Sequence, residues 1–258
     1  MNAFRYLPAL AVLSTTVLSG CGAPPGRPRE GSATPAPRDV VEFGRLYSEN
    51  CAACHGPEGR GGAAIALANP VYLAIADDRS IRTAIAAGVR GTSMPAFAQA
   101  AGGMLTEKEI DALVGGIRSR WNRPDAVGGA TPPSYAATSA GDTQRGERAY
   151  QTFCQSCHGI DGRGGPKASA ITNDSFLALT SDQYLRTIVI AGRPELGAPD
   201  WRGYLTGPAL SSVEGAALSS VEGRPMADQE VTDVVSWLAS HRVQTPGRPY
   251  AASNGFPQ

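Results

Sequence analysis

Two short motifs, each with two cysteines followed by a histidine, carry most of the chemistry in this 258-residue sequence. The motifs are CAACH, with Cys51, Cys54 and His55, and CQSCH, with Cys154, Cys157 and His158. Two cysteines at this spacing can each form a thioether with one vinyl group of a porphyrin, and the adjacent histidine then becomes the proximal ligand of the iron. The motifs are therefore typical of c-type haem attachment.

Paired cysteines have other uses, which must be weighed against haem attachment. A single C-x-x-C can be a thioredoxin-like redox pair, and two such pairs can hold one zinc ion. Here a histidine follows each pair, and the pairs lie 103 residues apart within an internal repeat. These features favour two covalently bound haem c groups, one in each half of the chain.

The repeat extends well beyond the two motifs. YSENCAACHGPEGRGG in the first half matches YQTFCQSCHGIDGRGG in the second. Each half also ends in a stretch with the apolar spacing of an amphipathic helix, at residues 105–120 and 226–242. Thr106, three residues before Glu109, is the expected N-cap of the first of these helices. The apolar faces are predicted to be Leu105, Ile110, Leu113, Val114 and Ile117 in the first, and Met226, Val231, Val234, Val235 and Leu238 in the second.

The repeat and the composition predict two small domains, at residues 40–121 and 145–243. Residues 122–144 are rich in Pro, Gly, Ala and Ser and form the expected linker, and residues 244–258 form a C-terminal tail. Each domain is small for a core made only of side chains, so a large apolar cofactor would complete it. Lys+Arg and Asp+Glu are 23 each, which gives no basic excess for binding nucleic acid.

The N-terminus has the pattern of an export signal. Residues 1–20 contain Arg5 and then a short apolar stretch, and Leu18-Ser19-Gly20-Cys21 resembles a bacterial lipobox. We expect Cys21 to be lipidated, although a cleaved signal followed by an incidental cysteine is the alternative. Residues 21–39 are rich in proline and form the expected tether to the membrane.

Each copy resembles a class I cytochrome c domain, and the whole chain resembles the diheme cytochrome c lipoproteins of bacterial respiratory chains. The resemblance rests on the two motifs, the pair Met94-Pro95 and the terminal helices. It implies an all-α fold of two tandem domains, each wrapped around one haem, with Met94 reaching the iron opposite His55. Met104 is a nearby alternative, but its place at the start of the last helix suggests a role in the core. Ligation by histidine and methionine raises a haem potential and fills both axial positions, which suits electron transfer.

The second copy departs from this pattern at one residue. Ala198 stands where the first copy has Met94, and alanine cannot bind iron. The second copy also carries 17 more residues before its last helix, including the tandem duplication ALSSVEGA-ALSSVEG at 209–223. We see no function in this duplication.

Four interpretations of the second haem remain open. Met226 could be the sixth ligand, although it aligns with Leu105 and methionine is a common core residue. The sixth position could instead be empty or hold water. Lys167 or another loop group could bind, or His241 could bind, although a solvated histidine near a helix end is the simpler interpretation.

The predicted function is single-electron transfer on the periplasmic side of a bacterial envelope. The resemblance implies a donor at the membrane, such as a quinol-oxidising complex, and an acceptor that is a terminal oxidase, a reductase or another cytochrome. The alternatives are a haem enzyme or ligand sensor, acting on peroxide, a sulfur anion or a gas at an open sixth site, and a purely structural haem subunit. Glu195 and Asp200 flank Ala198, but we expect them to be solvated, so the sequence offers little for catalysis.

Overall fold

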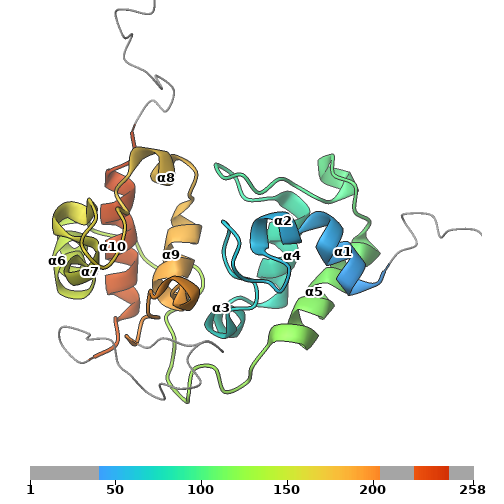
Figure 1. Ribbon diagram of the computed structural model, residues 1–258, viewed down its shortest axis with the longest axis horizontal. Helices are drawn as coiled ribbons and strands as arrows, with labels where there is room; N and C mark the ends of the chain where they lie inside the picture. The colour runs from blue at the N-terminus through green and yellow to red at the C-terminus, as the bar shows by residue number, and fades with distance from the viewer. Residues whose placement is uncertain (1–40, 204–223, 244–258) are drawn as a thin grey trace, which may run out of the picture. The chain divides into compact units, whose positions relative to one another are not determined.

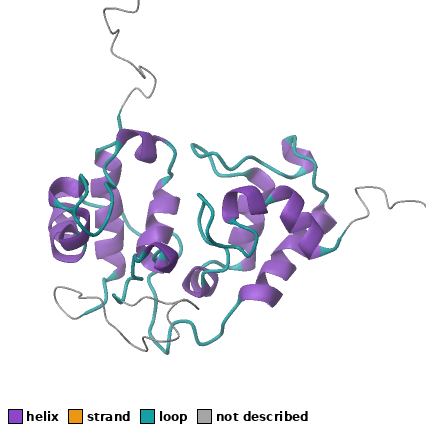
Figure 2. Cartoon of the chain, in the orientation of Figure 1, coloured by secondary structure: helices purple, strands orange, loops and turns teal. Residues whose placement is uncertain are grey.

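The computed structural model describes residues 41–203 and 224–243. The predicted signal peptide, Cys21 and the tether lie outside the described residues, as do the duplication at 209–223 and the tail at 244–258. Within the described part the elements are helices and turns, with two isolated bridges and no strand, as Figure 2 shows. The prediction of an all-α fold is confirmed.

The α-helices follow the same order in the two copies, and the described part of the second copy has one additional 3-10 helix, η3 (Figure 1; η denotes a 3-10 helix). The first copy contains α1 (Phe43–Asn50), α2 (Ala52–His55), α3 (Pro70–Ile75), α4 (Asp78–Ala87), η2 (Gln99–Ala101) and α5 (Glu107–Trp121). The second copy contains α6 (Thr143–Phe153), α7 (Gln155–His158), η3 (Ile160–Gly162), α8 (Asp174–Ala178), α9 (Asp182–Ala191), η4 (Pro194–Leu196) and α10 (Asp228–Ser240).

Matching residues cap matching helices. Asn69 begins α3 and Asn173 begins α8, and each asparagine oxygen accepts hydrogen bonds from two backbone N–H groups of the first turn. Thr106 begins α5 and forms the predicted capping box with Glu109. In α10 the matching position is Ala227, which has no hydroxyl, so only the Glu230 carboxylate bond to the Ala227 N–H remains, at 2.8 Å.

The first and last helices of each copy pack closely at a glycine. A Cβ on Gly116 of α5 would lie 2.0 Å from the ring of Phe43 on α1. A Cβ on Gly146 of α6 would lie 2.0 Å from the Asp233 carbonyl oxygen and 2.8 Å from Cβ of Trp237, both on α10. In the repeat, Phe43 aligns with Gly146 and Gly116 with Trp237. The aromatic residue and the glycine have therefore exchanged helices between the copies, and the close approach is kept.

The apolar faces predicted for the two terminal helices are confirmed, since all ten residues named for them are buried. The expectation for Met104 was wrong. Its side chain is 78% exposed, because the chain turns at Gly102, and Leu105 is the first residue of this segment to reach the core.

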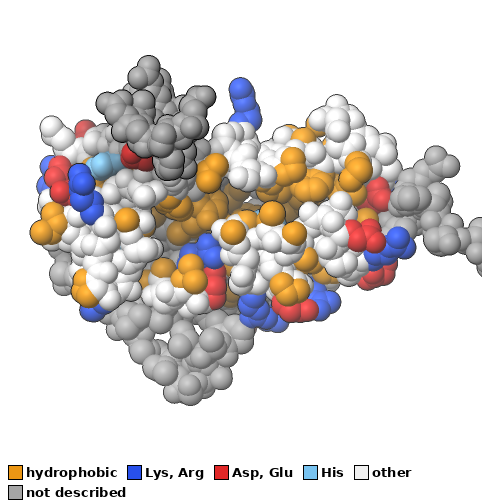
Figure 3. Space-filling model, turned by 45° about the horizontal axis from the view of Figure 1, so that its top comes forward, with side chains coloured by type: hydrophobic (Ala, Val, Ile, Leu, Met, Phe, Trp, Pro, Cys, Tyr) orange, Lys and Arg blue, Asp and Glu red, His pale blue; other side chains and the backbone are white. Residues whose placement is uncertain are grey.

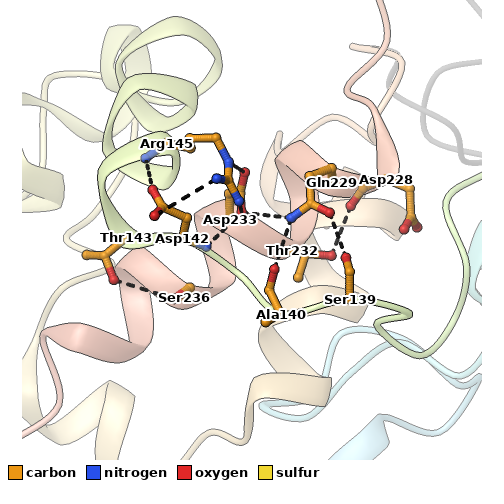
Figure 4. A network of polar contacts seen from close by, with 10 residues as sticks. All are labelled: Ser139, Ala140, Asp142, Thr143, Arg145, Asp228, Gln229, Thr232, Asp233 and Ser236. Carbon is orange, nitrogen blue, oxygen red and sulfur yellow. Dashed lines mark hydrogen bonds and ion pairs between the residues drawn. The ribbon is translucent and has the colours of Figure 1, made fainter.

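A polar network fastens the start of α6 to α10 (Figure 4). Asp233, which is 2% exposed, accepts hydrogen bonds from the Arg145 guanidinium at 2.7 and 3.0 Å. It also accepts from the backbone N–H of Asp142 at 2.8 Å and from the Gln229 amide at 2.9 Å. Burial on its own raises the pKa of Asp233, but these hydrogen bonds outweigh it, so the pKa lies below its ordinary value.

The predicted linker is held against the second copy by a buried arginine. Arg186 on α9 donates from Nε to the Ser134 carbonyl oxygen at 2.9 Å and from Nη1 to Thr232 Oγ1 at 2.8 Å. It also forms an ion pair with Asp228 at the start of α10.

Among the described residues, no helix combines the length and the apolar character needed to cross a membrane.

The glycine contact in α5 can be tested with two neighbouring substitutions. Gly116→Ala should lower the free energy of unfolding by about 1–3 kcal/mol, because its methyl group would displace the Phe43 ring. Gly115→Ala meets no atom within 4 Å and should raise it by up to about 1 kcal/mol, because alanine favours helix. Denaturant unfolding of the haem-loaded protein measures both, and equal effects would contradict the packing described.

The Asp233 network predicts a pH-dependent loss of stability. At pH 7, Asp233→Asn should lower the free energy of unfolding by about 1–2 kcal/mol, a range that allows for the solvent exposure of Arg145. Because the folded-state pKa is depressed, the contribution of the carboxylate is present above the unfolded value near 4. It is lost as the pH falls through the folded-state value, so the wild type and the variant should converge below about pH 4. Glu147→Gln, at an exposed position of α6, is the control and should change little.

Candidate haem sites

The first motif lies where α1 ends and the short helix α2 begins. The N–H groups of Cys54 and His55 donate to the Cys51 carbonyl oxygen at 3.2 and 3.0 Å, so the three residues share one helical turn. Gly56, with a φ of +82°, ends the turn. The second motif repeats this arrangement, since Cys157 and His158 donate to Cys154 at 3.1 and 3.0 Å.

Both motif histidines are held through Nδ1. The ring nitrogen of His55 lies 2.7 Å from the Ile65 carbonyl oxygen, and that of His158 lies 2.8 Å from the Ser169 carbonyl oxygen. Since a carbonyl can only accept, Nδ1 carries the proton and Nε2 keeps a free lone pair for a metal. Burial of His55, which is 7% exposed, lowers its pKa against the smaller opposing effect of this hydrogen bond, and the neutral ring is favoured.

A tyrosine fixes the turn after each histidine. Tyr47 donates its hydroxyl hydrogen to the Gly56 carbonyl oxygen at 2.8 Å, and Tyr150 does the same to Gly159 at 2.5 Å. These are the tyrosines that stand four residues before each first cysteine in the repeat. A structural role explains why both copies contain this tyrosine. Its hydroxyl joins α1 or α6 to the loop that follows the motif histidine.

The repeated Gly-Arg-Gly-Gly segment allows this loop to lie against the motif. A Cβ on Gly62 would lie 2.1 Å from the Cys54 carbonyl oxygen, and one on Gly165 would lie 2.6 Å from that of Cys157. A side chain at either position would push the loop away from the cysteines. The loop could then no longer present Ile65 or Ser169 to the histidine.

The four motif cysteines fit a covalent haem. All four are unpaired, and burial raises the pKa of Cys51 to about 11 and that of Cys154 to about 12, with a smaller contribution from the neighbouring cysteine. Each turn thus offers two free thiols and a free imidazole nitrogen, the donor set that c-type attachment requires. On the face drawn in Figure 3, apolar side chains line a recess in the surface, which is the kind of surface that an apolar cofactor covers.

Met94 lies in a loop that starts at the end of α4. The Val89 N–H donates to the Met94 carbonyl oxygen at 3.1 Å, and the Met94 N–H donates to the Thr92 hydroxyl at 3.2 Å. Gly88 lets the loop close, because a Cβ there would lie 2.7 Å from the Pro95 carbonyl carbon. The Met94 side chain is half-buried and packs against the core.

The second copy has the same loop with alanine in place of methionine. Arg193 and Ala198 exchange both backbone hydrogen bonds, at 2.9 and 3.0 Å, and the first of them matches the Val89–Met94 bond. A Cβ on Gly192 would lie 2.7 Å from the Ala198 carbonyl oxygen, as one on Gly88 would lie 2.8 Å from that of Met94. The backbone of Ala198 therefore takes the place of Met94.

Met226 takes the place of Leu105. The Met226 N–H donates to the Trp201 carbonyl oxygen at 2.8 Å, and the Leu105 N–H donates to the matching Phe97 at 2.7 Å. Met226 is 7% exposed and belongs to the buried core. This position favours the packing role, and ligation by Met226 stays one of the four untested interpretations of the second haem.

The other two candidate ligands lie near the proximal side of the second site. Lys167 is exposed in the loop closed by the bond from the Gly165 N–H to the Ala168 carbonyl oxygen, two residues before the Ser169 that holds His158. His241 caps the C-terminal end of α10, where Nδ1 lies 2.8 Å from the Trp237 carbonyl oxygen. Its ring meets the edge of Trp237, which stacks on Tyr150.

Asp200 differs from the sequence expectation of a solvated carboxylate. It is 5% exposed, and its carboxylate accepts hydrogen bonds from Nη2 of Arg202 at 2.6 Å and from the Arg202 N–H at 2.8 Å. The Arg202 guanidinium in turn lies 4.6 Å from the ring centre of Trp201. The sequence feature that could have indicated this burial is Arg202, which lies two residues after Asp200 and pairs with its carboxylate.

Two hydrogen bonds join the haem region of the first copy to the loop of the second, one from a side chain of each copy. The Asn69 amide donates to the Ala191 carbonyl oxygen at 2.9 Å, and the Arg193 guanidinium donates to the Gly62 carbonyl oxygen at 3.2 Å. Arg193 also forms an ion pair with Glu195. The start of the Ala198 loop is thus held by residues of the first copy as well as by its own backbone hydrogen bonds.

The chain was compared with known protein families and with curated proteins. Residues 39–115 and 141–213 match the family described as cytochrome c oxidase, cbb3-type, subunit III. A curated relative, the cbb3-type cytochrome c oxidase subunit CcoP of Azospirillum sp. (strain B510), is 31% identical over 155 residues. The match covers 50% of this chain and 47% of the relative, so the chain spans about half the length of that relative.

Two solved structures resemble the chain distantly. A chain of the Kuenenia stuttgartiensis reducing HAO-like protein complex gives a TM-score of 0.40 at 20% identity, covering 81% of this chain and 100% of that one. The dihydro-heme d1 dehydrogenase NirN, in complex with DHE, gives 0.26 at 28% identity, covering 37% of this chain and 18% of that one. Neither likeness is close enough to support a functional argument.

Proposed function

Because this chain belongs to the family of cbb3-type cytochrome c oxidase subunit III, we propose that it is a diheme c-type cytochrome that carries single electrons. The observation that supports this most directly is the repeated proximal site. In both copies two thiols and an imidazole lie on one turn, and a backbone carbonyl holds Nδ1 of the histidine. Two such sites in one chain suit an electron carrier, because a bound haem supplies one-electron redox chemistry.

The chain's own residues would hold and shield this cofactor. Cys51, Cys54, Cys154 and Cys157 would attach two haem c groups, and His55 and His158 would orient Nε2 toward the irons. Met94 is the proposed sixth ligand of the first haem, and its half-buried side chain in a loop pinned at Thr92 and Val89 supports this role. A methionine opposite a histidine would raise the potential of the first haem.

We further propose a membrane-attached location on the periplasmic side. Lipidated Cys21 would anchor the chain, and residues 21–39 would tether it. The donor would be a membrane protein such as a quinol-oxidising complex, and the acceptor a terminal oxidase, a reductase or another cytochrome. The name of the Azospirillum relative, an oxidase subunit, supports a respiratory partner.

Covalent attachment predicts the number of haems on the denatured chain. The wild type should carry two, and replacing either Cys51 and Cys54 or Cys154 and Cys157 by alanine should leave one. The mass and haem absorbance of the denatured chain measure this without depending on whether each variant folds. Cys21→Ser, the control, should keep two haems, and a wild-type chain with fewer than two would contradict the proposal.

Electron transfer and the role of Met94 predict a redox titration with two one-electron waves per chain. Met94→Leu should lower one potential by on the order of 0.1 V, a fraction of the range of about 0.8 V that axial ligands span. Met104→Leu is the matched control, because Met104 is ten residues away in sequence and exposed, and it should leave both potentials unchanged. If the two variants behave alike, Met94 is not the ligand.

A further inference from the structure

We propose that the second haem receives no sixth ligand from this chain, and that its iron binds a small exogenous ligand of the diatomic class, such as carbon monoxide, nitric oxide or cyanide. This inference rests on the proposed function, because it requires a haem at His158. It concerns one chemical position, opposite His158 and beside the loop that carries Ala198.

The loop that carries Ala198 has the backbone contacts of the loop that carries Met94. The bond from the Arg193 N–H to the Ala198 carbonyl oxygen repeats the Val89–Met94 bond, and Gly192 repeats the close approach made by Gly88. The backbone that delivers methionine in the first copy is therefore present in the second. Replacing methionine by alanine removes the γ, δ and ε atoms, and with them the sulfur that binds iron.

The Ala198 loop is held in place by several hydrogen bonds. Arg193 and Ala198 bond in both directions, which closes a tight turn around η4. The Asn69 amide donates a hydrogen bond to the Ala191 carbonyl oxygen, just before this turn, at 2.9 Å. Glu195 is paired with Arg193, and Asp200 with Arg202, so both carboxylates near Ala198 are engaged.

Few methionines, lysines and histidines of the whole sequence are left to bind the second iron. Apart from the residues already assigned, the chain contains the methionines Met1, Met104 and Met226, the lysines Lys108 and Lys167, and the single histidine His241. Residues 204–223 and 244–258 contain no methionine, lysine or histidine. Met1 begins the predicted signal peptide, and Met104 and Lys108 belong to the first copy. Three candidates therefore remain, namely Met226, Lys167 and His241.

Each of these three has another position or role. Met226 is buried in the core at the place of Leu105, with its backbone bonded to Trp201. Lys167 lies in the loop that holds the proximal His158. His241 ends α10, whose 13 residues span about 20 Å from the end beside Met226, and it contacts Trp237.

The Ala198 loop therefore leaves a coordination position for a ligand from solution. A five-coordinate or water-ligated haem iron binds diatomic molecules when its pocket admits them, whereas a second protein ligand fills the same position and must first be displaced. The first haem, with Met94 in place, should therefore bind them more weakly than the second and should not bind carbon monoxide under the same conditions. The two copies would then differ in chemistry because of one side chain.

The test uses the full haem-loaded protein and two spectroscopic readouts. Low-temperature EPR of the ferric protein should give one low-spin and one high-spin signal, and cyanide should convert the high-spin signal to low-spin. The ferrous protein should bind one carbon monoxide per two haems. Two low-spin signals together with no carbon monoxide binding would overturn the proposal.

Substitutions locate the effect. Ala198→Met should restore a second low-spin signal and abolish carbon monoxide binding, whereas Ala198→Leu, similar in size but without sulfur, should keep the high-spin signal. Met226→Leu should change neither readout, since Leu105 occupies the same place in the first copy. If Met226→Leu creates a high-spin signal, Met226 is the ligand and the proposal fails.

The failure of this inference can be separated from that of the proposed function. A denatured chain with two covalent haems, together with two low-spin signals, would leave the electron carrier intact and reject the open site. Fewer than two haems would reject the diheme cytochrome itself.

Discussion

The fold of each copy depends on one constraint: a histidine directly after the second cysteine must present Nε2 while Nδ1 is held by a backbone carbonyl. Ile65 supplies that carbonyl in the first copy and Ser169 in the second. Neither could reach the ring unless the chain turned back sharply after the motif, and glycines and the tyrosine hydroxyl make this turn possible. The residues that repeat most strictly are thus those that build the proximal side, and they do so through backbone geometry.

The helix pair that closes each copy tolerates more change because it needs only a close approach. Phe43 lies over Gly116 in one copy, while Trp237 lies over Gly146 in the other, with the large and small residues on opposite helices. Packing requires that the sum of the two volumes fit, and it does not fix which helix carries the ring. When the two copies are aligned one position at a time, each of these positions is simply a mismatch, and the exchange between the helices is missed.

The sequence predicted the features that follow from local pattern. The motifs, the apolar faces of the terminal helices and the Thr106 cap all depend on residues within one or two turns of each other. It failed where neighbours distant in sequence decide the outcome. Met104 was expected in the core but is exposed, because the turn at Gly102 places it outside. Asp200 was expected in solvent but is buried, and its carboxylate is paired with Arg202, whose guanidinium lies over the Trp201 ring. The linker's anchoring through Arg186 and Ser134 likewise joins residues 52 positions apart.

The loop that carries Met94 in the first copy and Ala198 in the second depends both on local pattern and on residues distant in sequence. Its backbone is repeated although the methionine side chain is not, so contacts other than this side chain hold its shape. In the second copy these contacts include bonds to the first, since the Ala191 carbonyl oxygen accepts from Asn69 and Arg193 donates to Gly62. Gly62 lies against the carbonyl of Cys54, at the proximal side of the first site. Backbone contacts of this kind hold the shape of the loop whether position 198 carries methionine or alanine, and this explains how the frame of the repeat persists around Ala198.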